Sequence, residues 1–139
     1  MTHDNNRLKF RIWNHQTNSY RYFNLAIQES RLALAAYAQQ YDAADLCWEY
    51  CTGLFDSGDI LIYEGDTLTG TATVDEGSFK YCGTVEWNDQ SELIGWYVCD
   101  KYGNGWELKQ VHAKISSDNV SGKIIGNIHQ NKQILAKIK

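Results

Sequence analysis

Residues 60–74 read ILIYEGDTLTGTATV, in which two runs rich in β-branched, aromatic and Thr residues lie on either side of Glu-Gly-Asp. Such runs favour β-strands. Glycine tolerates backbone angles that other residues avoid, and Asp side chains bind the amides of turns. We therefore expect strands at 60–63 and 67–74, with Gly65 in an unusual backbone conformation and Asp66 accepting hydrogen bonds from turn amides.

The sequence after this stretch continues as short strands separated by turns. The pair Asn104-Gly105 is typical of a tight hairpin turn, because both residues tolerate positive φ angles. Strands at such regular spacing favour a small barrel or rolled sheet, since closure removes exposed strand edges. We expect further strands at 79–87, 93–99, 106–115 and 120–128, and a short helix at 129–138.

The sequence before this stretch predicts a hairpin followed by a helix. Apolar and polar residues alternate over 8–13, and a polar turn leads to a partner strand at about 20–25. Residues 30–41 place Leu, Tyr and Ala at helical spacing, which predicts one amphipathic helix with Ser30 as its cap. We expect this helix to fray or restart before Cys47.

Charge is distributed unevenly along the 139-residue chain, whose formal net charge is −4. Residues 1–31 carry five Lys and Arg against two Asp and Glu, residues 32–108 carry two against fourteen, and residues 109–139 carry six against one. Either the basic ends neutralise the acidic middle, or the middle forms an acidic face that repels nucleic acid and attracts a basic partner. Direct nucleic-acid binding is disfavoured, because it needs clustered Lys and Arg.

The composition, with 43% apolar and 22% charged residues, is typical of a globular protein of one domain. No apolar run approaches the length of a membrane helix, and the first residues are polar where a secretory signal would be apolar. We expect a cytoplasmic protein that does not interact with membranes.

The sequence lacks the residue patterns that are typical of active sites and metal sites. The four Cys and four His lack the spacing of a zinc site or of a Cys–His nucleophile pair. The carboxylates of Asp56, Asp59, Glu64 and Asp66 do not match a calcium-binding loop and specify no acid–base partner, so we expect them to be structural. The sequence predicts no catalytic residue, no metal and no cofactor, and hence no enzyme.

Aromatic residues make up 13% of the chain, and several fall on neighbouring predicted strands. These rings either fill the interior of a small barrel, or line a groove for a peptide or a pocket in which a base stacks. Trp96 and Tyr97 are adjacent in one strand, so one of them must point away from the core. The candidate binding residues are Trp87, Trp96, Trp106, Tyr97, Tyr102, Tyr63, Glu64 and Asp66.

Five blocks of sequence occur together and in a recognisable order: KFRIWN at 9–14, TGLFD at 52–56, YEGD at 63–66, GTVEW at 83–87 and IGNIHQN at 125–131. In these blocks the chain resembles the YopX family, small proteins encoded mostly by bacteriophages and prophages. The resemblance implies an SH3-like barrel in the C-terminal part. It implies no activity, because a fold alone does not supply one.

The complete prediction is a mainly β (α+β) fold. It is a single YopX-like domain over 1–139, with a hairpin and one inserted helix at about 7–50 and an SH3-like barrel at about 52–139. Asp59 stands where the family turn usually has Gly, and Lys132 replaces a customary Pro, so the geometry of these turns does not follow from the family.

The predicted function is that of a non-catalytic phage or prophage accessory protein. We expect it to bind a host or phage protein through an acidic surface that carries exposed aromatic side chains. One alternative is a small-ligand protein that sequesters a nucleotide signal and counters host defence. Another is an acidic mimic of DNA that inhibits a basic host protein. Homo-oligomers are compatible with the aromatic content and with open strand edges.

Overall fold

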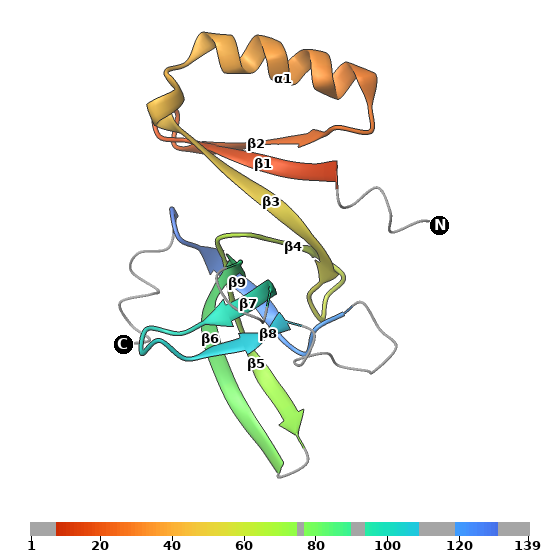
Figure 1. The fold of residues 1–139 in the computed structure, drawn as a ribbon, viewed down its shortest axis with the longest axis vertical. Coiled ribbons are helices and arrows are strands. Elements are labelled where there is room, and N and C mark those ends of the chain that lie inside the picture. Colours follow the sequence, from red (N-terminus) through yellow and green to blue (C-terminus); the bar gives the residue numbers. More distant parts are fainter. Residues whose placement is uncertain (1–7, 75–76, 90–93, 109–118, 131–139) are drawn as a thin grey trace. The chain divides into compact units, whose positions relative to one another are not determined.

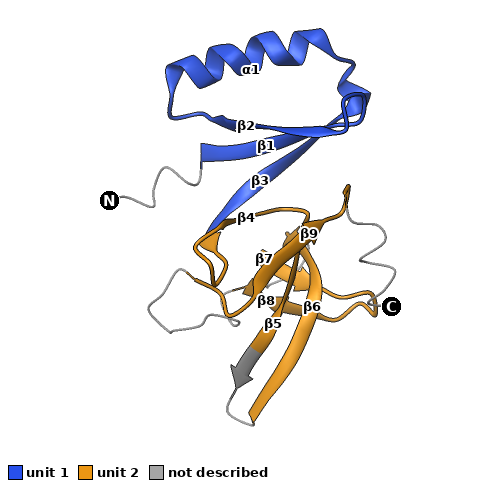
Figure 2. Ribbon diagram, turned by 180° about the vertical axis from the view of Figure 1, so that it is seen from behind, with its two compact units in different colours: residues 1–53 blue, residues 54–139 orange. Residues whose placement is uncertain are grey.

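The protein is mainly β in the part of the chain that the computed structural model describes, which is residues 8–74, 77–89, 94–108 and 119–130. In these ranges it has two antiparallel sheets and one α-helix (Figure 1). The chain divides into a first unit, residues 1–53, and a second unit, residues 54–139 (Figure 2). No described helix is long and apolar enough to cross a membrane. A single domain over the whole chain stays a prediction.

The first unit begins with the predicted hairpin. β1 (Lys9–Asn14) pairs antiparallel with β2 (Ser19–Asn24). The side chain of Asn14 closes the turn, because its Oδ1 accepts hydrogen bonds from the amides of Gln16 and Thr17 at 2.8 and 3.3 Å. The alternation of apolar and polar residues therefore predicted this hairpin correctly.

α1 (Gln28–Gln40) lies over one face of this hairpin and confirms the predicted helix (Figure 1). Its Tyr37 side chain is buried in the apolar cluster of the first unit. The prediction that Ser30 caps the helix is wrong, because Ile27 occupies the N-cap position. The Ser30 hydroxyl instead accepts a hydrogen bond from the amide of Asn24 at 2.7 Å, which ties the first turn of α1 to the end of β2.

The expectation that the helix frays or restarts before Cys47 is confirmed, but the strand that follows, β3 (Leu46–Phe55), was not predicted. A short 3-10 helix, η2 (Ala43–Asp45), ends the helical region, and β3 then pairs antiparallel with β1. Side chains over 48–51 alternate between exposed and buried, which is the period of a strand. The strand order of this sheet is β2-β1-β3-β4, in which β4 (Leu61–Tyr63) belongs to the second unit.

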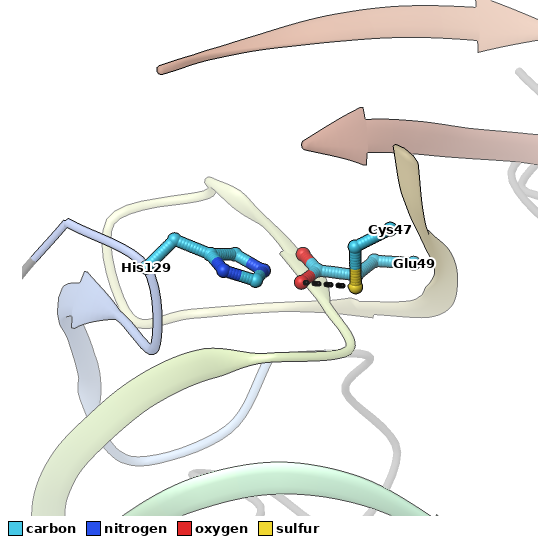
Figure 3. Close-up of side chains that lie close together, drawn as sticks. All are labelled: Cys47, Glu49 and His129. Atoms are coloured by element: carbon cyan, nitrogen blue, oxygen red, sulfur yellow. Dashed lines mark hydrogen bonds between the residues drawn. The ribbon is translucent and has the colours of Figure 1, made fainter. Parts of the chain in front are cut away.

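A buried ion pair connects β1 and β3. Arg11 Nε lies 2.8 Å from Glu49 Oε1, and these residues are 4% and 2% exposed. The Tyr20 hydroxyl donates to the same oxygen at 2.9 Å. The Cys47 thiol donates a long, weak hydrogen bond to Glu49 Oε2, over 3.9 Å (Figure 3). Buried charges need such partners. These contacts therefore explain how two charged side chains, one on each strand, are accommodated on a buried face of the sheet.

The second unit is built around an antiparallel sheet with the strand order β8-β7-β6-β5-β9. Its strands overlap the predicted ones, with ends shifted by a few residues. Their buried side chains form one core with Leu54 and Ile62. The strands are β5 (Asp66–Val74), β6 (Gly77–Asn88), β7 (Gly95–Cys99), β8 (Gly105–Glu107) and β9 (Lys123–Asn127).

The predicted SH3-like barrel is not confirmed. In the described ranges this sheet is open, because β8 and β9 stand at its two edges and no pairing joins them. Most of the strand expected at 106–115 and of the helix expected at 129–138 lies outside the described residues. The sequence therefore predicted the described strands of this sheet, whereas sheet closure depends on edge pairing that periodicity does not reveal.

The turn between β4 and β5 matches its prediction. Gly65 has a φ of +89°, which is the left-handed conformation that glycine tolerates best. The carboxylate of Asp66, 2% exposed, accepts a hydrogen bond from the Tyr63 amide at 2.8 Å. The Gly65 amide donates to the carbonyl of Val85 at 2.9 Å, and the Gly65 carbonyl accepts from the Ile128 amide at 3.0 Å. This turn therefore connects β4, β5 and β6 with the residue that follows β9.

A second carboxylate, that of Asp56, also has the structural role expected for it. Its Oδ1 accepts hydrogen bonds from the amides of Gly58 and Ile60 at 2.8 and 3.0 Å, and its Oδ2 accepts from the Ile124 amide at 3.1 Å. Asp59 has a φ of +65°, which is the left-handed conformation that glycine tolerates best. The Asn119 side chain donates to the Asp59 carboxylate at 2.7 Å, which anchors this turn.

Two glycines allow β5 and the segment before β9 to approach closely. A Cβ built on Gly70 would lie 2.5 Å from the Cα of Gly122. A Cβ built on Gly122 would overlap the Tyr81 hydroxyl and the Thr69 carbonyl. No side chain fits at either position unless the backbone moves.

Gly122→Ala should therefore destabilise the protein, because overpacking a close contact costs about 1–3 kcal/mol. Gly105→Ala is the matched control, since its added methyl group would meet the Cys99 sulfur at an ordinary distance of 3.6 Å. Urea unfolding of both variants measures the difference. Equal free energies of unfolding for the two variants would contradict the close approach.

Candidate functional site

Four of the predicted binding residues lie in or against the interior of the second unit. Trp96 and Trp106 are half-buried and pack against its core. Tyr63 and Asp66 are 7% and 2% exposed, and Asp66 holds the turn before β5. For the two Trp residues, the structure agrees with the interpretation that the rings fill the core.

The remaining aromatic candidates are accessible. Trp87 is 47% exposed at the end of β6, although its ring packs edge-on against Trp96 with 5.1 Å between centroids. Tyr102 is 77% exposed in the turn between β7 and β8. Tyr97 is half-buried, and it alternates with core-facing Trp96 and Val98. The prediction that Trp96 and Tyr97 point to opposite faces is confirmed.

The strand register brings charged residues beside Tyr97 on the outer face of this sheet. Glu86 of β6 is directly opposite Tyr97, and Glu107 of β8 is opposite it on the other side. Cys99 lies two residues further along β7 and shares this face. Directly opposed residues have Cβ atoms about 4.5–5.5 Å apart, so a carboxylate flanks the Tyr97 side chain on either side.

A cavity of about 430 Å³ opens over this part of the sheet. Trp87 and Tyr97 are the predicted site residues among its lining, although the Trp87 ring packs on Trp96 and so lies on the opposite face of the sheet from the Tyr97 ring. The other lining residues were not predicted, because they come together only through the pairing of β6, β7 and β8. The cavity is lined by Glu86, Trp87, Asn88, Asp89, Tyr97, Cys99, Gly103 and Gly105.

The turn around Gly103 differs from the prediction, which placed the positive φ angles at the pair Asn104-Gly105. The positive φ angle falls on Gly103, at +88°, and not on Asn104. The reason is the Asp100 side chain, whose Oδ1 accepts hydrogen bonds from the amides of Tyr102 and Asn104, each at 2.9 Å. Burial raises the pKa of Asp100, but hydrogen bonds from Asn104, Tyr102 and Gly103 outweigh this effect, so the pKa is lowered.

The pKa values of the Cys99 thiol and the Tyr97 hydroxyl in the cavity are both raised, which favours their neutral forms. Burial raises the pKa of the Cys99 thiol, and the charge of Glu86 and a hydrogen bond to Glu86 raise it further. Burial likewise raises the pKa of Tyr97, with added contributions from Glu107 and Cys99. A reactive cysteine needs a lowered pKa. This environment has the opposite effect, so the cavity suits binding better than nucleophilic chemistry.

The carboxylates of this face are not neutralised by the described cations. The Arg11–Glu49 ion pair belongs to the first unit. The cavity therefore places the Tyr97 ring beside the carboxylates of Glu86 and Asp89, for which no ion pair with a described Lys or Arg is found.

Glu86→Gln should make Cys99 more reactive. The substitution removes a negative charge that raises the thiol pKa, so the thiolate fraction at about pH 8 and the alkylation rate should rise several-fold. Cys82 is an internal control, because its pKa is raised by burial without a contribution from Glu86. Peptide-level mass spectrometry after iodoacetamide treatment measures both rates. An unchanged rate at Cys99 would contradict the contact with Glu86.

Comparison with known proteins supports the resemblance found in the sequence. The model of the family described as YopX protein matches residues 9–136. The crystal structure of protein EF1440 from Enterococcus faecalis is similar in fold, with a TM-score of 0.54 and 16% sequence identity, over 91% of this chain and 96% of that chain. The curated proteins contain no match. Because the family match extends over most of the sequence, this chain belongs to the YopX family.

Proposed function

We propose that this YopX protein is a non-catalytic phage or prophage accessory protein that binds a host or phage protein through the acidic, aromatic-bearing surface of its second unit. The observation that carries the proposal is that exposed Trp87 and half-buried Tyr97, on the two faces of β6 and β7, lie next to the carboxylates of Glu86 and Asp89. For these carboxylates no ion pair with a described Lys or Arg is found. Trp and Tyr are enriched among the residues that dominate protein–protein binding energy. Charged groups around such anchors steer a partner of opposite charge.

The excess of carboxylates over the middle of the chain supports a basic partner. Residues 32–108 contain fourteen Asp and Glu against two Lys, and the described residues of the cavity belong to this segment. Negative charge on this scale favours encounter with a positively charged surface and raises the association rate at low salt. A basic protein surface therefore matches this cavity.

A nucleotide ligand is less well supported. An aromatic cavity can stack a base. The described lining, however, includes the carboxylates of Glu86 and Asp89 and no Lys or Arg, so it would repel the phosphate groups. Mimicry of DNA by the acidic segment is the other alternative. It predicts that DNA competes with this protein for a basic partner, which distinguishes it from the proposed function.

Affinity capture with the full chain tests the proposed function. Trp87→Ala should lose a specific protein that the unaltered chain captures, because truncation of an anchor costs about 2 kcal/mol, which is about 30-fold in affinity. Trp48→Ala is the matched control, since Trp48 lies in the first unit and is 42% exposed, against 47% for Trp87.

Glu86→Gln provides a second variant that keeps the aromatic packing of Trp87 on Trp96 intact. It should weaken capture of the same protein and make capture less sensitive to salt. Circular dichroism verifies that all variants are folded. Equal capture by the unaltered chain, Trp87→Ala and Glu86→Gln would exclude this surface as the binding site.

A further inference from the structure

The turn between β7 and β8 is closed by hydrogen bonds between Asp100 and Asn104. The amide of Asp100 donates to the Asn104 carbonyl at 2.8 Å, and the amide of Asn104 donates to Asp100 Oδ1 at 2.9 Å. The side-chain amide of Asn104 also donates, through Nδ2, to Asp100 Oδ2 at 3.1 Å. This last bond exists only while the side chain at position 104 is a hydrogen-bond donor, because a carboxylate can only accept.

The strand pairing leaves the backbone nitrogen of the next residue, Gly105, outside the ladder. Because the Asp100 amide bonds to the Asn104 carbonyl, Cys99 and Gly105 face each other as a non-hydrogen-bonded pair. The N–H of Gly105 therefore points away from β7, toward the sheet edge that β8 forms in the described ranges. Asn104 and Gly105 are both exposed. The Gly105 nitrogen is thus accessible and is not held by a bond to β7.

This arrangement suits a reaction within the chain. After hydroxide has removed its proton, the Gly105 nitrogen can attack Cγ of Asn104, so that a new C–N bond closes a cyclic imide. The bond between Cγ and Nδ2 breaks, and the side-chain nitrogen takes up protons from water and leaves as ammonia. Water then opens the imide at either of its carbonyl carbons, which leaves an aspartate or an isoaspartate at position 104. Glycine favours the ring closure, because it has no Cβ that would crowd the ring.

We infer that Asn104 is a site of spontaneous deamidation and that the product opens this turn. In the aspartate product a carboxylate replaces the amide that bonds to Asp100 Oδ2, so that repulsion between two negative charges replaces a hydrogen bond. The isoaspartate product also adds a methylene group to the backbone, which disturbs the alignment of Gly105 with Cys99. The turn contributes Gly103 and Gly105 to the cavity, so its opening changes the shape of the cavity.

Incubation of the full chain in mildly alkaline buffer, followed by peptide-level mass spectrometry, tests the chemical step. We expect Asn104 to convert to both aspartate and isoaspartate. Asn18 is an internal control, because it is also an exposed turn residue but is followed by Ser19, and it should convert much more slowly. Gly105→Ala is the matched variant, since its methyl group would meet the Cys99 sulfur at an ordinary distance of 3.6 Å. This methyl group crowds the ring closure and should slow the conversion about tenfold.

The variant Asn104→Asp tests the opening of the turn, because it carries the charge of the product from the start. The Tyr102 amide donates to Asp100 Oδ1 and reports on this turn. Its hydrogen exchange, measured by NMR, should be several-fold faster in Asn104→Asp than in the unaltered chain. Asn104→Ser is the matched control, since it removes the side-chain amide without adding a charge, and it should change the exchange rate less.

Conversion of Asn104 that is no faster than that of Asn18 would overturn the inference. Equal rates in the unaltered chain and in Gly105→Ala, or aspartate without any isoaspartate, would exclude the attack by the Gly105 nitrogen. Exchange of the Tyr102 amide that is equal in Asn104→Asp and in the unaltered chain would contradict the opening of the turn.

Discussion

The backbone of Gly65 is the point on which the second unit depends. Its amide donates to the Val85 carbonyl of β6, and its carbonyl accepts from the Ile128 amide just after β9. A φ of +89° allows both bonds to form from one residue. Val85 directly precedes Glu86 and Trp87, which line the cavity. The hydrogen bond between Gly65 and Val85 therefore also positions these two residues relative to the start of β5.

The sequence blocks shared with the YopX family serve mainly this framework. Gly83 lets β6 approach β7, because a Cβ there would overlap the Cys99 carbonyl. The Asn127 side chain accepts hydrogen bonds from the amides of His129 and Gln130, which shapes the chain after β9. Glu86 and Trp87 are the members of these blocks that also line the cavity. The family pattern therefore explains the fold better than it explains the specificity of binding.

Local patterns were sufficient to predict much of the fold. The hairpin of β1 and β2 and the helix α1 follow from periods of two and 3.6, and the roles of Gly65 and Asp66 follow from turn chemistry. β3 was missed, because no strand was expected between the helix and residue 60. The positive φ at Gly103 was missed because the Asp100 side chain, and not the Asn-Gly pair, determines that turn. Glu86 joins Tyr97 only through the register of β6 and β7, which no local pattern contains.

Amide hydrogen exchange measures the role of Gly65 most directly. If this residue ties the second unit together, the amides of Gly65 and Ile128 should exchange as slowly as those in the middle of β6, since all of them open only when the unit unfolds. The Tyr102 amide, which is bonded to the Asp100 side chain in an exposed turn, is the reference for local opening. Exchange of Gly65 and Ile128 as fast as that of Tyr102 would contradict this account of the fold.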